Sequence, residues 1–165
     1  MKIQKDLEYG KSVIYNTYQC YLIESIEHLK NDFQLSKTLD FPLGCKLVRG
    51  AYLITEKEHH GVNCPVHDSY ENTTISYNCA IQLCLDQIEQ GANLKVTMAT
   101  HNMESIQLAL NTMSSKSLTT NSNVQFAQIN GLGDHLSLSL VREGQSVLKL
   151  LPCGSIEEVL PWLGR

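Results

Sequence analysis

The chain has 165 residues, of which 42% are hydrophobic and 18% charged, and its formal net charge is −4. That length is sufficient for one domain, which would bury roughly 70% of the surface of the unfolded chain. The slightly acidic balance argues against a nucleic-acid partner and a polybasic membrane anchor, and no apolar run approaches the roughly 20 residues of a membrane-spanning helix.

Neither the N-terminus nor the cysteines indicate a secreted protein. Residues 1–6 lack the apolar core of a signal peptide and the acid-poor character of a transit peptide. The six cysteines are scattered, contain no C-x-x-C pair and in several cases fall at apolar periodic positions. Buried thiols in a reducing compartment are therefore favoured over a disulfide framework.

Five short, β-rich apolar runs alternate with helical patterns along the chain. The predicted strands span residues 13–19, 45–52, 94–100, 124–129 and 147–151. Between the second and third strands, apolar residues from Tyr77 to Ile88 recur at helical spacing, and they predict a helix that Gly91 ends.

Polar capping residues place further helices. Asn102 is the expected N-cap of the helix after the third strand, and Ser155 opens a capping box ahead of the last helix. Residues 20–37 also have a helical pattern. The stretch 135–141 alternates Leu and Ser with period two, but a capping Asp134 and a following glycine favour a short helix.

Repeated strand–helix units predict a parallel sheet with crossover helices. Two architectures compete at this point, an open doubly wound sheet and part of a (β/α)8 TIM barrel. A complete barrel needs about 250 residues, so this chain would supply only some of its units. A barrel fragment would also leave two unpaired sheet edges, which favours an interpretation of the chain as a partial product.

In both architectures ligands bind at the carboxyl ends of the strands. The predicted strands end in polar groups, glycines and an aromatic residue, at residues 16–19, 50–52, 99–102, 128–131 and 152–154. The second strand also carries Lys46 and Arg49 within an apolar run. Such cations cost several kcal/mol when buried without a partner, so this strand either meets a ligand or is an edge strand with solvated charges.

Competing motifs are weak. His59, His60, Cys64 and His67 are metal ligands by type, but their spacing matches no standard zinc site, so we expect a solvated loop and no metal there. A nucleophile elbow of the G-x-S-x-G kind is missing, and residues 131–133 lack the full G-x-G-x-x-G spacing of a phosphate loop.

Several longer motifs occur in a fixed order. They are NTYQCYL at 16–22, KLVRGAYL at 46–53, ATHN at 99–102, FAQINGLGD at 126–134, P-x-G at 152–154 and VLPWL-x-R at 159–165. Together they resemble the eukaryotic mitochondrial proline dehydrogenase (proline oxidase) family. The resemblance implies a (β/α)8 barrel of the proline dehydrogenase type. Residues 1–12 would be a lead-in, and residues 13–165 would form a partial barrel domain that covers roughly its second half.

The resemblance also implies an activity for the complete protein. It would be a FAD-dependent oxidoreductase that converts L-proline to 1-pyrroline-5-carboxylate and passes the electrons to ubiquinone. It would associate peripherally with the matrix side of the mitochondrial inner membrane, although no targeting signal is evident in this sequence. We expect the isolated chain to be inactive because half a barrel cannot close its sheet.

Residue by residue, the resemblance assigns a site. The cofactor-binding residues would be Gln19, Lys46, Val48, Gly50, Ala51, Thr100, His101 and Asn102, and the substrate-binding residues would be Tyr52, Ile129, Trp162 and Arg165. Lys46, Tyr52 and Arg165 are expected to be catalytic. Positive charge at Lys46 would stabilise reduced flavin near its N5 atom, and the Arg165 guanidinium would clamp the substrate carboxylate.

Three residues depart from the family pattern. Leu150 and Trp162 stand where the family has tyrosines, and Asp68 stands where it has a threonine near the cofactor phosphates. A second arginine, which in the family follows the one at position 165, is not in this sequence. These departures support an alternative, a truncated or diverged non-catalytic homologue with weak flavin binding. The choice between proline and hydroxyproline stays open.

Overall fold

Five parallel strands form one sheet in the computed structural model, which describes residues 12–50, 52–60, 64–118 and 122–163. The strands are β1 (Tyr15–Gln19), β2 (Leu43–Val48), β3 (Leu94–Ala99), β4 (Val124–Ile129) and β5 (Val147–Leu150). Each strand pairs in parallel with the next one along the chain, so the spatial order is the sequence order.

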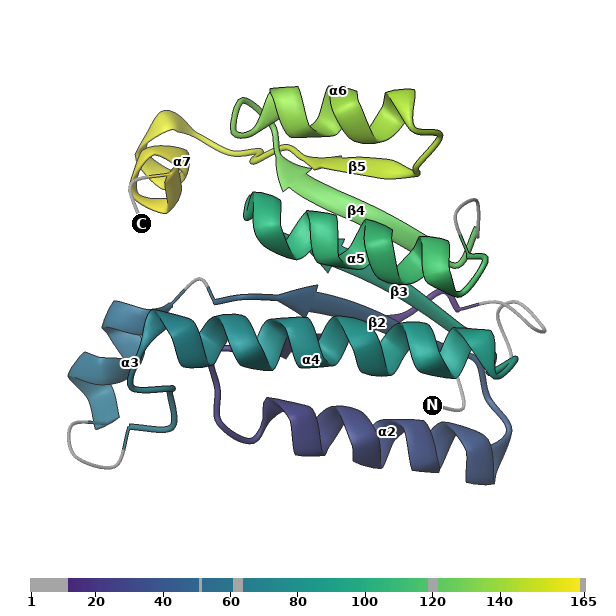
Figure 1. Ribbon diagram of the computed structural model, residues 1–165. Coiled ribbons are helices and arrows are strands. Elements are labelled where there is room, and N and C mark those ends of the chain that lie inside the picture. The colour runs from purple at the N-terminus through teal and green to yellow at the C-terminus, as the bar shows by residue number, and fades with distance from the viewer. Residues whose placement is uncertain (1–11, 51, 61–63, 119–121, 164–165) are drawn as a thin grey trace.

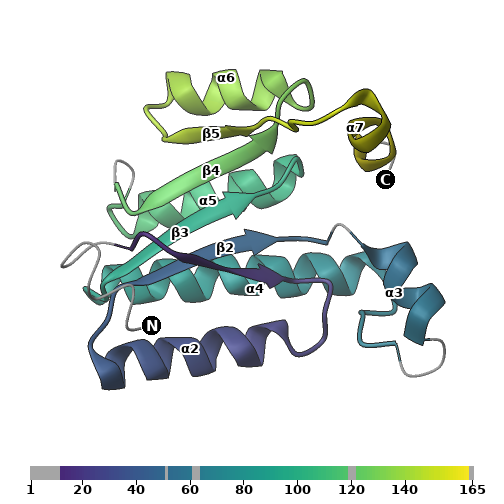
Figure 2. The same cartoon turned by 180° about the vertical axis from the view of Figure 1, so that it is seen from behind.

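Four helices cover a single face of this sheet (Figure 1). They are α2 (Ser25–Leu39), α4 (Tyr70–Glu89), α5 (Met103–Ser115) and α6 (Asp134–Arg142). The short helices α3 (Leu53–His60) and α7 (Ile156–Leu163) lie at the end towards which the strands point. Figure 2 shows the opposite face of the sheet without a covering helix. A doubly wound sheet has helices on both faces, whereas consecutive strands with helices on one face form an arc of a (β/α)8 barrel.

The hydrophobic core lies between the sheet and the four covering helices. Alternate strand residues point towards the helices, as the two-residue period of a strand requires. The fully buried members include Leu47, Val96 and Phe126 from the strands and Tyr77, Ile81 and Leu85 from α4. Burial of each such side chain is worth roughly 1.5–3 kcal/mol, so this layer supplies the main stabilisation of the arc.

Most predicted elements are confirmed, with shifted ends. The second strand starts two residues earlier and ends at Val48, so Tyr52 is not part of it. The helix expected over 20–37 begins only at Ser25, because the backbone just before it pairs with another loop. In that pairing Ile23 N–H donates to the Pro65 carbonyl at 2.9 Å.

Two further expectations are wrong. The segment expected as a solvated loop around His59 is helix α3, whose Glu and Lys residues favour helix without giving a clear apolar face. Asp134 is the first residue of α6 and not its cap, since Gly133 holds the N-cap position with a left-handed φ of 65°. Asp134 in the first turn still complements the positive end of the helix.

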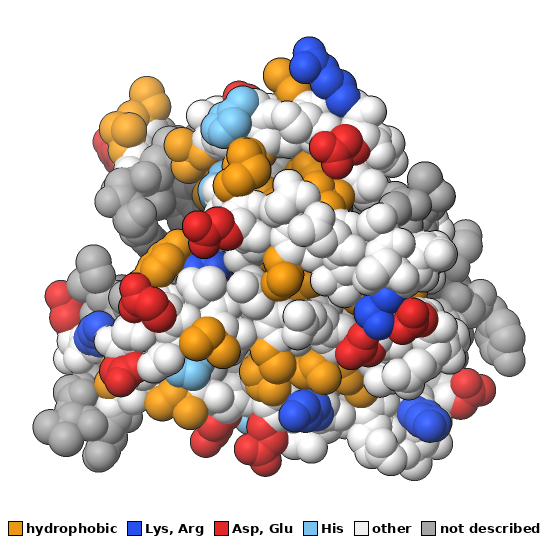
Figure 3. All heavy atoms as spheres, in the orientation of Figure 1, with side chains coloured by type: hydrophobic (Ala, Val, Ile, Leu, Met, Phe, Trp, Pro, Cys, Tyr) orange, Lys and Arg blue, Asp and Glu red, His pale blue; other side chains and the backbone are white. Residues whose placement is uncertain are grey.

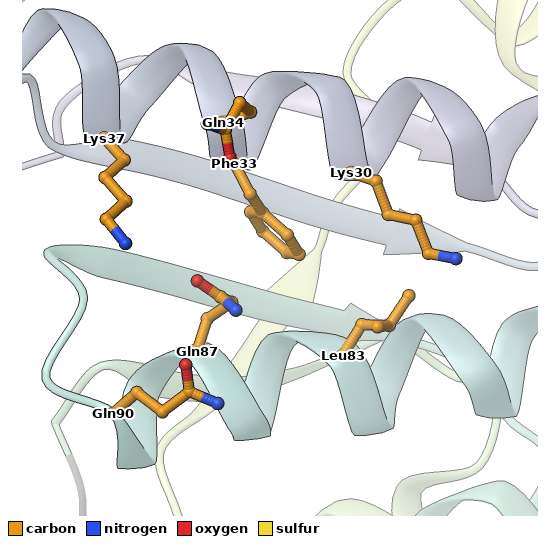
Figure 4. A pocket seen from close by; sticks show the side chains of 7 residues that line it. All are labelled: Lys30, Phe33, Gln34, Lys37, Leu83, Gln87 and Gln90. Carbon is orange, nitrogen blue, oxygen red and sulfur yellow. The ribbon is translucent and has the colours of Figure 1, made fainter.

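The helix-covered surface shows charges of both signs scattered among polar atoms (Figure 3). It contains a shallow hollow of about 230 Å³ between α2 and α4 (Figure 4). Lys30, Phe33, Gln34, Lys37, Leu83, Gln87 and Gln90 line the hollow. It lies on the outer helical layer, away from the strand ends, so it is not the candidate site. None of the helices in the described ranges is long and apolar enough to cross a membrane.

Candidate functional site

Lys46 lies on the open face of the sheet, on the second of its five strands. Its register partners are Thr17 on β1 and Thr97 on β3, so the three side chains share one face. Adjacent strands are about 4.8 Å apart, which brings a cation and two hydroxyls into one row. Lys46 is half-buried and Thr97 is buried. The row is therefore a polar strip across a face that the covering helices leave open.

Gln19 and Val48 form the next row towards the carboxyl ends of the strands. They are register partners at the last residues of β1 and β2, and Val48 also pairs with Ala99. The Gln19 Oε1 atom is buried and has no hydrogen-bond partner in the part of the chain that the structure describes. A buried acceptor without a donor is costly, so this oxygen is suited to accept a hydrogen bond from a ligand.

Arg49 points to the opposite side of β2, as its parity predicts. Its guanidinium donates to Ser105 Oγ at 3.2 Å and to Thr74 Oγ1 at 2.5 Å. It also lies 4.8 Å from the centroid of the Tyr70 ring. Hydroxyls on α4 and α5 and aromatic rings on α4 thus hold this cation, so it is neither solvated nor free for a ligand.

Gly50 makes room for a protein side chain. A Cβ atom at this position would lie 2.3 Å from Cδ1 of Tyr21. Tyr21 is buried, and its hydroxyl donates to Glu56 Oε1 on α3 at 3.4 Å. Burial, followed by the Glu56 carboxylate, raises the pKa of Tyr21 to about 12. Tyr21 therefore links the end of β1 to the end of β2 and to helix α3.

Tyr52 and Asp68 lie on the loops beyond β2. Tyr52 directly precedes α3 and is 39% exposed. Asp68 is exposed and accepts a hydrogen bond from the Asn72 side-chain amide at 2.6 Å, one residue before the N-cap Ser69 of α4. A carboxylate there complements the positive end of a helix, which gives Asp68 a structural role that a phosphate-side threonine would not have.

Thr100 and Asn102 shape the turn from β3 into α5. Thr100 Oγ1 accepts from the Asn102 backbone N–H at 3.1 Å. The Asn102 side chain accepts from Ser105 N–H at 2.8 Å, as expected of an N-cap, and donates to the Tyr70 hydroxyl at 3.2 Å. Both side chains thus fix the backbone of this rim.

His101 lies between these two residues and reaches across to β4. Its Nε2 atom accepts a hydrogen bond from the Ile129 backbone N–H at 3.0 Å. Burial, and then the charge of Lys149, lowers the pKa of His101 below its usual value of 6.5. A neutral ring is what this contact needs, because only an unprotonated nitrogen can accept.

Ile129 and Leu150 face the open side at the far end of the sheet. They are register partners on β4 and β5, and Leu150 is 46% exposed. Leu150 therefore places an exposed apolar side chain beside Ile129 on this face.

The structure brings Gln19, Lys46 and Val48 together on adjacent strands and places Ile129 on the same face. Ala51 and Arg165 lie outside the described residues, as does the side chain of Trp162. Sequence reasoning missed Thr17, Thr97 and Tyr21. Thr17 and Thr97 lie beside Lys46 because of the pairing register between the strands, and this register cannot be read from the sequence alone.

Among the described residues, no group of three or more His, Cys, Asp or Glu side chains is arranged to hold a metal ion. Cys20, Cys45 and Cys84 are unpaired and buried in the core. Burial raises the pKa of Cys20 to about 12, and the pKa of Cys84 is raised by the same cause. Thiols in such surroundings are inert and act as small apolar side chains.

The open face fits a flavin by its chemistry. An isoalloxazine ring is flat, carries hydrogen-bond donors and acceptors along one edge, and gains negative charge when reduced. Gln19 offers an unpaired buried acceptor, and Lys46 offers a cation one row away. The candidate site therefore lies on the open face of the barrel arc, towards the carboxyl ends of the strands, which is where this fold binds ligands.

Comparison with known proteins gives the family. Residues 2–165 match the family model described as proline dehydrogenase, and the chain belongs to this family. It is 41% identical over 162 residues to proline dehydrogenase 1, mitochondrial, of Dictyostelium discoideum, a match that covers 94% of the chain and 28% of that protein. The human protein of the same name is 34% identical, over 100% of the chain and 28% of its own length.

One further relative and one solved structure are also similar to the chain. Bovine hydroxyproline dehydrogenase is 37% identical over 94% of the chain and 35% of its own length. Proline utilization A (PutA) from Bdellovibrio bacteriovorus has a similar fold, with a TM-score of 0.86 and 19% identity over 98% of the chain and 17% of that protein. The chain thus spans about a third or less of the length of the proteins that it matches.

Proposed function

We propose that the complete polypeptide oxidises L-proline to 1-pyrroline-5-carboxylate and that this chain contributes the flavin-binding half of the barrel. The observation that carries the proposal is the pairing of Gln19, with its buried unpaired oxygen, and Lys46 on adjacent strands of the open face. Membership of the proline dehydrogenase family supports the choice of substrate.

FAD, when bound, would supply the acceptor for the hydride that leaves the proline ring carbon next to nitrogen, while the nitrogen loses its proton. Gln19 would accept a hydrogen bond from the flavin edge, and Lys46 would hold positive charge near the N5 position. Val48, Gly50, Ala51 and residues 100–102 would line the rest of the cofactor cleft.

The substrate side would be built from four residues. Ile129 would give the proline ring an apolar wall, and Tyr52 and Trp162 would border it. Arg165 would hold the carboxylate through its planar guanidinium, whose paired N–H groups match two carboxylate oxygens. These roles follow from the family resemblance, and the placement of Ile129 on the open face supports its part.

We also propose mitochondrial ubiquinone as the electron acceptor, with peripheral association at the matrix side of the inner membrane. The names of the matched relatives from Dictyostelium, Caenorhabditis and human include the word mitochondrial, which supports the compartment. The acceptor and the membrane follow from the family resemblance.

Anaerobic mixing of the full-length gene product with FAD and L-proline tests the proposal. We expect bleaching of the flavin absorbance with proline and turnover with an artificial electron acceptor. D-proline and buffer alone serve as controls, and hydroxyproline in a parallel sample measures substrate preference. Bound flavin that no proline concentration bleaches would overturn the catalytic assignment.

Weak flavin binding together with no proline-dependent bleaching would support the second candidate, a truncated or diverged non-catalytic homologue with weak flavin binding. The exposed Leu150 beside Ile129, where the family has a tyrosine, is the observation that favours it. Restoration of proline-dependent bleaching by Leu150→Tyr would then locate the loss at this position.

A further inference from the structure

The hydrogen-bond ladder between β3 and β4 ends just before Ile129. Its last backbone contact runs from Thr100 N–H to the Ala127 carbonyl at 3.2 Å. Beyond this point the chain turns into α5, whose first residue is Met103. The next donor on β4, the Ile129 N–H, therefore meets no backbone acceptor on β3 and needs another partner.

His101 supplies that partner through its side chain. The Nε2 atom accepts the Ile129 N–H at 3.0 Å, which assigns the single ring proton to Nδ1. Gly133 leaves space for the ring, since a Cβ there would lie 3.2 Å from His101 Cδ2. The imidazole thus extends the ladder by one contact at the edge where ligands bind.

The remaining contacts of this segment also converge on Ile129. Its carbonyl accepts from Leu132 N–H at 3.1 Å, and the next residue, Asn130, donates its N–H to the Leu150 carbonyl at 2.9 Å. Of these contacts of Ile129 and Asn130 in the described part of the chain, the one with His101 is made by a side chain. The contact with His101 can therefore be removed by a side-chain substitution, whereas the backbone contacts around Ile129 stay in place.

We propose that His101 is a positioning residue, which sets the place of the Ile129 wall for the substrate ring through its Nε2 atom. This inference rests on the proposed function for the role of Ile129 and goes beyond it for His101. The two ring nitrogens thus have separate roles. Nε2 accepts a hydrogen bond from the Ile129 N–H, and the Nδ1 N–H is the group available for the proposed contact with the cofactor.

Two variants of the full-length protein distinguish the roles of the two ring nitrogens. In His101→Gln the amide oxygen reaches about as far as Nε2 and keeps an acceptor for Ile129. In His101→Asn the shorter amide mimics the Nδ1 edge and removes that acceptor. Loss of one hydrogen bond predicts a KM for proline about two- to tenfold higher in His101→Asn than in His101→Gln.

Amide hydrogen exchange at Ile129 gives a readout that does not depend on turnover. We expect faster exchange in His101→Asn and unchanged protection in His101→Gln, with flavin affinity measured for both. Equal flavin loss in both variants, without a change in Ile129 exchange or KM, would overturn the positioning role. If the parent protein does not oxidise proline, the proposed function fails, while the exchange experiment still decides the contact.

Discussion

The two faces of β2 surround a positive charge with different groups. On the helix-covered face, Arg49 is surrounded by groups of the protein, with two hydroxyls and a tyrosine ring within contact distance. On the open face, Lys46 has two threonines as register neighbours and lies one row from the unpaired oxygen of Gln19. Three positions apart on one strand, one cation is bound by the fold, and the other lies where a ligand can reach it.

The two cations therefore contribute to different properties, Arg49 to folding stability and Lys46 to ligand binding. A cation that the protein holds contributes to folding, and its loss leaves Ser105 and Thr74 with fewer partners. A cation on the open face adds little to the stability of the arc, because its partner arrives with the ligand. The same strand therefore contains one residue that fixes the architecture and one that is available for chemistry.

The largest expected effect comes from a matched pair of substitutions at these cations. Arg49→Met should lower the free energy of unfolding by about 2 kcal/mol, because two charged hydrogen bonds and a cation–π contact are lost. Lys46→Met should leave stability unchanged or higher, since a charge leaves the interior of the sheet. Its proline-dependent flavin reduction should fall about tenfold to a hundredfold.

Urea unfolding and stopped-flow flavin reduction measure the two quantities on the same full-length preparations. Arg49→Lys is the control for charge alone, because an ammonium group keeps the charge but loses the planar fork. Equal loss of stability in the Lys46 and Arg49 variants would remove the distinction between the faces.

A smaller effect is expected at the rim between the faces. Gly50→Ala should cost about 1–2 kcal/mol, because the added methyl group collides with the Tyr21 ring. In a Tyr21→Ala background the same substitution should cost less, because the ring atoms at 2.3 and 2.6 Å are gone and only the contact with the Cβ of residue 21 at 2.8 Å remains. A double-mutant cycle measured by urea unfolding gives the coupling energy between the two positions. Additive losses would mean that Gly50 is needed for something other than Tyr21, such as the approach of a ligand.

The sequence was sufficient for most of the architecture and for part of the site. The strand cores were predictable because their short apolar runs are rich in β-forming residues and most are followed by a helical pattern. The helix α3 was not, because its charged residues give no apolar face. The neighbours of Lys46 and the Tyr21–Gly50 contact depend on strand register and on loop pairing between distant segments, which a local pattern does not encode.

The smallest expected effect is a pH dependence at the far end of the rim. The folded-state pKa of His101 is lowered, first by burial and then by Lys149, which itself pairs with Asp134 at 2.5 Å. As the pH falls below about 6.5, the unfolded chain takes up a proton at this site before the folded chain does, so stability decreases towards acid.

Protection of the Ile129 amide should be lost only at still lower pH, when His101 itself is protonated and can no longer accept. In Lys149→Met the charge that disfavours protonation is absent, so NMR titration of the His101 ring should give a midpoint at higher pH than in the parent protein. A midpoint at or above 6.5 in the parent protein would contradict this account, because a ring that is already protonated at that pH cannot accept the Ile129 N–H.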